Sequence, residues 1–184
     1  MQSGEIRAVY TQHSIRVYQA YSDLIVDDVI ENGRFGVGFK MERMTWIKPS
    51  FLWMMYRCGW AEKKGQERVL AIDVKRKSFD YLVRNAVISS YNKNLEIAKE
   101  EWKEAIANSD IRCQWDPERD INGNALKERT IQIGIRGKAL HDYVNNWILK
   151  MTDITEYVHK LNHMRLSGEN ILNLLPDEKV YKVT

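Results

Sequence analysis

The chain contains few of the residues that mark disulfide-rich, low-complexity or membrane-spanning proteins. Its 184 residues include two Cys, three Pro and ten Gly, so neither a disulfide framework nor long linkers are expected. No apolar run approaches the roughly 20 residues that a membrane span needs, and the N-terminus lacks the apolar stretch of a signal peptide. We therefore expect no membrane association, a cytoplasmic location, and reduced core thiols at Cys58 and Cys113.

The composition is that of an ordinary globular protein. Hydrophobic residues make up 44% and charged residues 29%, with a net charge of only +3. This charge is too small to indicate an extended nucleic-acid footprint. Strand and helix patterns are mixed, without a regular strand–helix–strand repeat, which predicts an α+β fold. We expect one domain over residues 1–169, a mixed or mostly antiparallel sheet with helices packed on it, and a C-terminal tail over 170–184.

Several elements follow from hydrophobic periodicity. Residues 14–32 are predicted to form a helix capped by Ser14, and residues 138–150 form the clearest helical pattern. Two alternating segments, 111–115 and 129–135, predict strands, and the N-G-N sequence at 122–124 could turn a hairpin between them.

The most informative segment is 44–60. It holds three of the six Trp residues around only two cations, Lys48 and Arg57. Pro49 favours a helix start and Gly59 a helix end, so a buried helix is expected from Pro49 to about Cys58. Charges inside a buried segment need partners, and the segment therefore predicts fixed positive charge at a defined place.

Long segments of the chain resemble a known family. They are M-T-W-I-K-P-S-F-L-W-M-M-Y-R at 44–57, Q-E-R-V-L-A-I-D at 66–73, Q-W-D-P-E-R-D at 114–120 and Q-I-G-I-R-G at 132–137, with I-R-A-V-Y-T and I-R-V-Y-Q-A-Y near the start. They are similar to the uncharacterised bacterial and fungal family named domain of unknown function 4291, over about Ile6 to Thr155. The resemblance implies no established activity.

Cations form the first group of candidate ligand-binding residues. They are Arg7, Arg16, Lys48, Arg57 and Arg68. A Lys beside a helix N-terminus suits an anion, and Arg on a strand suits bidentate contact with phosphate or carboxylate. The alternative is that these cations pair with Asp23, Asp27, Asp73 or Glu67 and only satisfy the core.

An acidic segment supplies the second group. Glu118 and Asp116 are candidate catalytic carboxylates, as a general base or as stabilisers of an oxocarbenium-like centre. Gln114 and Arg119 flank them as candidate ligand contacts. The alternative is a structural turn in which Asp116 caps and Arg119 bridges the acids.

Amide and aromatic residues complete the candidate set. Gln132 lies between two Ile residues and would share a strand face with Gln114, as a candidate ligand contact. The alternative is that this face of the sheet is only exposed to solvent. Tyr10 and Gln12, at a strand end, could contact a base or nicotinamide ring. No third ligand accompanies His159 and His163, so no metal site is predicted.

These groups suggest an enzyme that acts on a nucleotide or another phosphate-bearing ligand. Its specific version is ADP-ribosyl transfer from NAD, with Arg7 as the N-terminal strand cation and Glu118 or Asp116 as the carboxylate. This version rests on an analogy of parts and not on a motif match. The alternatives are a binding module for RNA or single-stranded nucleic acid, and a non-catalytic interaction protein.

Overall fold

The computed structural model describes residues 4–36, 38–92 and 95–184. In these ranges the chain forms six α-helices and nine strands in three sheets, so the α+β prediction is confirmed. The helices are α1 (Asp23–Asn32), α2 (Phe51–Cys58), α3 (Arg76–Asn85), α4 (Lys99–Asn108), α5 (Gly137–Asp142) and α6 (Thr155–Leu166). The strands are β1 (Arg7–Ala8), β2 (Ser14–Tyr21), β3 (Thr45–Ile47), β4 (Arg68–Lys75), β5 (Val87–Ile88), β6 (Ile111–Arg119), β7 (Ala125–Ile135), β8 (Ile148–Asp153) and β9 (Lys179–Val180).

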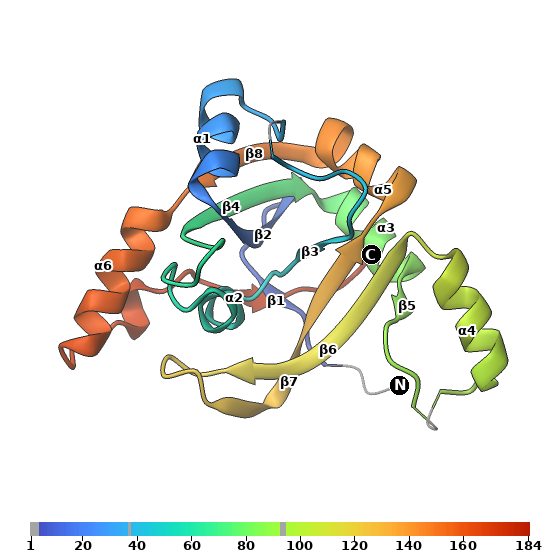
Figure 1. Cartoon of the computed structure of the whole chain (residues 1–184). Helices are drawn as coiled ribbons and strands as arrows, with labels where there is room; N and C mark the ends of the chain where they lie inside the picture. Colours follow the sequence, from blue (N-terminus) through green and yellow to red (C-terminus); the bar gives the residue numbers. More distant parts are fainter. Residues whose placement is uncertain (1–3, 37, 93–94) are drawn as a thin grey trace.

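Two of the three sheets contain seven of the nine described strands. The first has the order β2-β4-β8 and is antiparallel; the second has the order β3-β7-β6-β5, in which only β5 and β6 run parallel. The predicted hairpin is confirmed as β6–β7, the long arm in the lower part of Figure 1. The Tyr18 amide donates a 2.7 Å hydrogen bond to the carbonyl oxygen of Lys48, which ties β2 to the end of β3.

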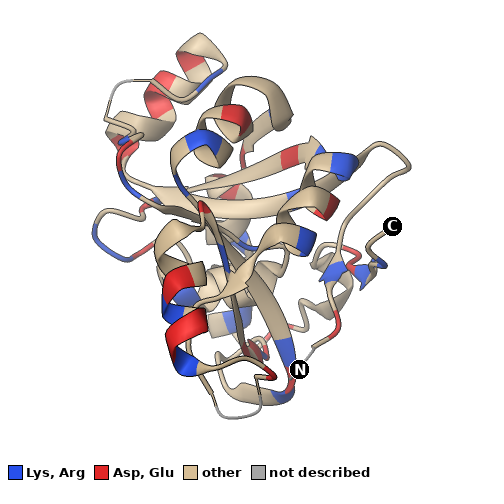
Figure 2. Cartoon of the chain, turned by 90° about the vertical axis from the view of Figure 1, so that its right-hand side faces the viewer, with Lys and Arg blue, Asp and Glu red and all other residues tan. Residues whose placement is uncertain are grey.

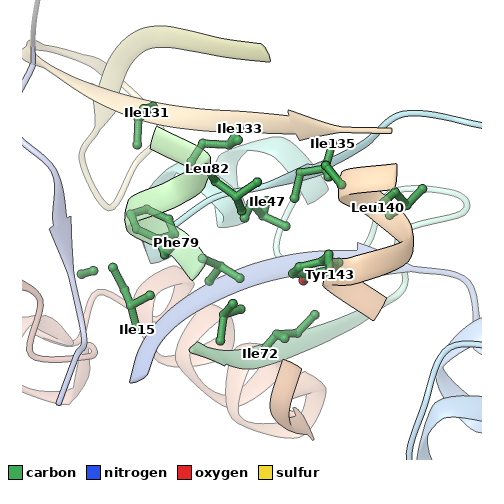
Figure 3. Packing of buried hydrophobic residues seen from close by; sticks show 14 of the residues in the cluster. Ile15, Ile47, Ile72, Phe79, Leu82, Ile131, Ile133, Ile135, Leu140 and Tyr143 are labelled. Atoms are coloured by element: carbon green, nitrogen blue, oxygen red, sulfur yellow. The ribbon is translucent and has the colours of Figure 1, made fainter. Parts of the chain in front are cut away.

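A large apolar core lies between these two sheets. Figure 3 shows Ile131, Ile133 and Ile135 of β7 facing Ile15 and Ile72 of the other sheet. Side chains of α3, α5 and the segment after α5 fill the space between them, including Phe79, Leu82, Leu140 and Tyr143. Because side chains alternate along a strand, the residues between the β7 isoleucines point away from this core.

A second core covers the other face of the β2-β4-β8 sheet. It contains Phe51, Met54, Met55 and Cys58 of α2 together with residues of α6, so the predicted burial of this helix is confirmed. Figure 1 shows α6 at one end of the molecule and α4 with β5 at the other. Cys58 and Cys113 are both free and buried.

Two predicted helices are correct only in part. Residues 14–21 form β2, and α1 begins only at Asp23, one residue after Ser22. Pairing with β4 over eight residues overrides the helical pattern here, because tertiary burial outweighs local propensity. The segment predicted as a helix over 138–150 is helical as far as Trp147, first as α5 and then as a π-helix from Tyr143. Residues 148–150 belong instead to β8, whose partner is again β4.

Residues 170–184, predicted as a tail, pack against the body of the protein. Ile171 and Tyr181 are buried, and β9 pairs with β1. Tyr181 also donates a hydrogen bond to the Asp80 carboxylate. In the described part of the chain, no helix combines the length and apolar composition that a bilayer span requires.

Candidate functional site

The segment after β3 positions the central cation of the site. Ile47 points into the core between the sheets, so its neighbours Trp46 and Lys48 project to the opposite side. Pro49 and Ser50 then start α2, and the Ser50 hydroxyl accepts a 3.1 Å hydrogen bond from the Trp53 amide. Gly59, in the left-handed conformation at φ 60°, ends the helix. Lys48 is thus held between a strand and a helix start, as the sequence predicts.

Lys48 has an unusual environment for an ammonium group. The residue is only 6% exposed, and no described carboxylate forms an ion pair with it. Its contacts are a long hydrogen bond of 3.4 Å to the Trp46 carbonyl oxygen and the Trp53 ring at 5.3 Å. Burial, as the largest cause, and the positive charge of Arg57 together lower the pKa of Lys48 from 10.5 to about 7, and Asp116 opposes this shift.

A cavity of about 440 Å³ opens beside Lys48. It lies where β2, β3, α2 and the β6–β7 hairpin meet. Its wall is formed by Gln19, Ala20, Tyr21, Met44, Thr45, Trp46, Lys48, Met54, Arg57, Gln66, Gln114 and Gln132. Four of the residues predicted as ligand contacts from sequence therefore share one cavity, namely Lys48, Arg57, Gln114 and Gln132.

Asp116 lies behind the two glutamine amides. Gln114 and Gln132 are directly opposite in the β6–β7 register. The Gln114 Nε2 donates to Asp116 Oδ1 at 3.0 Å and the Gln132 Nε2 donates to Asp116 Oδ2 at 2.7 Å. Each amide uses an N–H toward the carboxylate, and its oxygen is an acceptor group. The cavity wall therefore combines these two amides with the cations Lys48 and Arg57.

A buried hydrogen-bond network supports the β2 side of the cavity. The Gln19 Nε2 donates to the Tyr21 hydroxyl and to Thr45 Oγ1, both at 2.8 Å, and Gln19 Oε1 accepts from the Tyr143 hydroxyl at 3.0 Å. Burial raises the pKa of Tyr21 well above its usual value. Fully satisfied buried networks are rigid, so the network fixes the position of β3 relative to β2.

Gly134 allows two cavity side chains to approach β7 closely. A Cβ at this position would lie 2.6 Å from Met44 Sδ and 2.9 Å from Trp46 Cζ2. Any larger residue would displace these side chains, and both of them line the cavity. A glycine inside a strand commonly marks such a close approach.

Glu118 occupies a different place from Asp116. Its Oε1 accepts hydrogen bonds from Ser50 Oγ at 2.9 Å and from the Arg119 amide at 2.8 Å. Glu178 of the C-terminal segment accepts from the Phe51 amide at 2.7 Å, at the start of α2. Burial raises the pKa of Glu118, and raises that of Glu178 to about 8 with the help of the Glu118 charge. This carboxylate pair anchors the start of α2.

Three predicted cations lie outside the cavity. Arg16 forms a bidentate ion pair with Asp73, with hydrogen bonds of 2.8 and 2.9 Å. Arg68 pairs with Asp153, Asp27 and Asp23. Arg16 and Arg68 therefore follow the alternative interpretation, in which the cations pair with Asp residues of the fold. Arg7 is half-exposed, pairs with Glu5 at 3.1 Å and donates to the Glu178 carbonyl oxygen.

The remaining predicted contacts also lie elsewhere. Tyr10 donates a hydrogen bond to the Val180 carbonyl and packs edge-on against Tyr181. Gln12 lines a separate cavity that also contains Arg76. Arg119 stacks on the Tyr56 ring at 3.8 Å.

Sequence reasoning missed much of the cavity wall. Gln19, Thr45 and Trp46 are not among the predicted contacts, because Gln19 falls within the helix predicted over 14–32, and Thr45 and Trp46 precede the predicted helix start at Pro49. The usable signal was the alternation of Trp46 and Lys48 around Ile47. Within the described ranges, no group of three or more His, Cys, Asp or Glu side chains is placed to hold a metal ion.

The fold and the cavity define an α+β protein with a buried lysine at a polar, aromatic-walled site. The particular family is that described as domain of unknown function (DUF4291), whose model matches residues 5–181, and the chain belongs to it. The match also includes most of the C-terminal segment with Glu178 and Tyr181. The comparison with curated proteins finds no significant match.

Proposed function

We propose that the chain is an enzyme that binds a nucleotide cofactor in the Lys48 cavity, and that its reaction is ADP-ribosyl transfer from NAD. The observation that carries the proposal is the convergence of Lys48, Arg57, Gln114 and Gln132 on one cavity. Its volume, about 440 Å³, falls within the usual range for small-molecule sites.

Each part of such a cofactor has a suitable partner. Arg57 offers a guanidinium group that suits the phosphates. Tyr21 and Trp46 offer aromatic surface to a nicotinamide or adenine ring. The Gln114 and Gln132 oxygens, with the Asp116 carboxylate behind them, suit the positive charge that develops on the ribose carbon as the glycosidic bond breaks.

Asp116 is the better candidate carboxylate. Glu118 is held by Ser50 and by the Arg119 amide at the start of α2. Asp116 contacts two side chains of the cavity wall and influences Lys48 electrostatically. In this proposal, the cationic role first given to Arg7 passes to Arg57, because Arg7 pairs with Glu5 outside the cavity.

A compact site for one nucleotide fits the charge distribution better than a long nucleic-acid groove. Figure 2 shows Lys and Arg interspersed with Asp and Glu on the face that carries α4. Extended nucleic-acid binding needs a continuous basic surface.

Thermal-shift measurements with NAD, ATP, GMP and a short RNA test the proposal. We expect NAD to stabilise the wild-type chain, by roughly 2.7 kcal/mol when present at about 100 times its Kd. Arg57→Ala should abolish most of this shift, whereas Arg7→Ala, a matched control outside the cavity, should retain it. Incubation with NAD and a protein or nucleotide acceptor should release nicotinamide.

Other outcomes would contradict the proposal. Stabilisation by RNA alone would favour the binding module. No shift with any ligand, together with loss of folding in Arg57→Ala, would favour a purely structural role for the segment 44–60. NAD binding without nicotinamide release with any acceptor would refute ADP-ribosyl transfer.

A further inference from the structure

Lys48 is a buried amine that forms no ion pair with a carboxylate among the residues that the structure describes. Of its two described contacts, one is a long hydrogen bond to a carbonyl oxygen and the other is an aromatic ring. A buried ammonium group normally has a partner, because the burial of an unpaired charge costs several kcal/mol. A structural role alone does not explain why a lysine occupies this wall of the cavity.

The surroundings of Lys48 favour its neutral form. The charged and titratable groups that act on it are Arg57 and Cys58 on α2 and Asp116 on β6, and Tyr21 of β2 lines the same cavity. Burial and the Arg57 charge both oppose protonation, and the pKa of Lys48 falls to about 7. A lysine that is desolvated and placed beside another cation is an activated nucleophile.

We propose that Lys48 is the nucleophile that attacks the ribosyl carbon of NAD, so that the chain carries an ADP-ribosyl group on Lys48 Nζ. The inference rests on the proposed function and names the acceptor atom within the same cavity. It makes Lys48 a covalent catalyst rather than only a binding group.

The step balances without a further reagent. A bond forms between Lys48 Nζ and the anomeric carbon, and the bond from that carbon to the nicotinamide nitrogen breaks. The electron pair of the broken bond neutralises the pyridinium ring, and nicotinamide leaves uncharged. The amine proton passes to water, and the two glutamine oxygens, with the Asp116 carboxylate behind them, stabilise the positive charge in the transition state. The ribosyl amine can then open to an imine.

Mass spectrometry of the full-length chain tests this inference. We expect incubation with NAD to add the mass of one ADP-ribosyl group, and peptide mapping to locate it on the peptide that contains Lys48. Borohydride added to quenched samples should reduce the opened imine and make the adduct permanent. After this reduction the linkage should resist hydroxylamine, because a secondary amine, unlike a carboxylate ester, is not cleaved by it.

Two variants at Lys48 distinguish the nucleophile from a binding group. Lys48→Met and Lys48→Arg should both lose the adduct, and Lys48→Arg, which keeps a positive charge, should still show a thermal shift with NAD. Lys127→Met, which removes an exposed lysine of β7, should form the adduct as the wild type does. Melting curves of each variant check that the fold is retained.

The outcomes separate this inference from the proposed function. Nicotinamide release by the wild type with no adduct at any time, or release by Lys48→Met at the wild-type rate, would overturn the inference and leave ADP-ribosyl transfer standing. An adduct that hydroxylamine still cleaves after borohydride treatment would assign the nucleophile to a carboxylate instead. If NAD neither shifts melting nor releases nicotinamide, both proposals fail.

Discussion

Replacement of Lys48 by Met should stabilise the fold at neutral and acidic pH. Met has a similar length and carries no charge, so it removes the unpaired ammonium while it fills most of the same volume. It also relieves the repulsion between Lys48 and Arg57. Buried charges at functional sites commonly reduce stability in this way.

The pKa of Lys48 sets the size of the effect. It is 10.5 for the free side chain and about 7 in the folded chain, which corresponds to an upper limit of about 5 kcal/mol at ~1.4 kcal/mol per pKa unit. Between these two values the unfolded chain binds a proton that the folded chain does not. The wild type should therefore gain stability as the pH rises from about 7 to about 10.5.

Urea denaturation followed by circular dichroism, at about pH 6.5 and about pH 9, measures this dependence. Integration over that interval gives about 2.5 kcal/mol. The difference in unfolding free energy between Lys48→Met and the wild type should shrink by this amount as the pH rises, because contributions of other groups cancel in the difference. Lys127→Met is the control and should show no such trend.

A change below about 1 kcal/mol between the two pH values would refute the reasoning, since it would mean that Lys48 stays protonated in the folded chain. A loss of stability in Lys48→Met at both pH values would mean that the ammonium group makes a favourable contact in the fold. In either case the amine would not be available as a nucleophile near neutral pH.

Three further changes test the surroundings of the site. Wild-type stability should fall as the pH rises from about 4.5 towards about 8, because the pKa of Glu178 is higher in the folded chain than in the unfolded chain. Glu178→Gln should remove this fall, which urea titrations across the range would detect; the same dependence of unfolding free energy on pH in the variant would contradict it. Gly134→Ala should push Met44 into the cavity and weaken NAD binding in calorimetry, and an unchanged Kd would show that the cavity tolerates the shift. Tyr181→Ala should cost about 3–5 kcal/mol of stability, whereas Val180→Ala, at a partly exposed neighbour, should cost little; similar small losses in both would show that the C-terminal segment is dispensable.

The elements predicted correctly are those whose signals are local. Pro49, Ser50 and Gly59 mark the ends of α2 by their own backbone preferences. The β6–β7 hairpin combines strict alternation with the turn sequence around Gly123, which adopts φ 81°. β2 and the first three residues of β8 fall within predicted helices, because both strands owe their conformation to β4, and a partner strand does not appear in a local pattern.

Among the candidate cations, too, the local sequence does not show which residue each side chain contacts. Arg16 and Lys48 look equally suited to an anion in the sequence. Their difference is that Arg16 pairs with Asp73 across the β2–β4 pair, whereas the described contacts of Lys48 are a carbonyl oxygen and a tryptophan ring. Pairing partners are set by strand register, which long-range contacts decide.

The family, the α+β class and the aromatic segment that carries Lys48 into the interior can all be predicted from the chain alone, because they follow from motifs and local hydrophobic patterns. The polar groups around that lysine depend on long-range packing. This packing brought β2, β3, α2 and the β6–β7 hairpin together around one cavity, placed Asp116 behind the amides of Gln114 and Gln132, and left Glu118 at the start of α2. Burial and charge proximity depend on residues far apart in the chain, and they give Lys48 its chemistry.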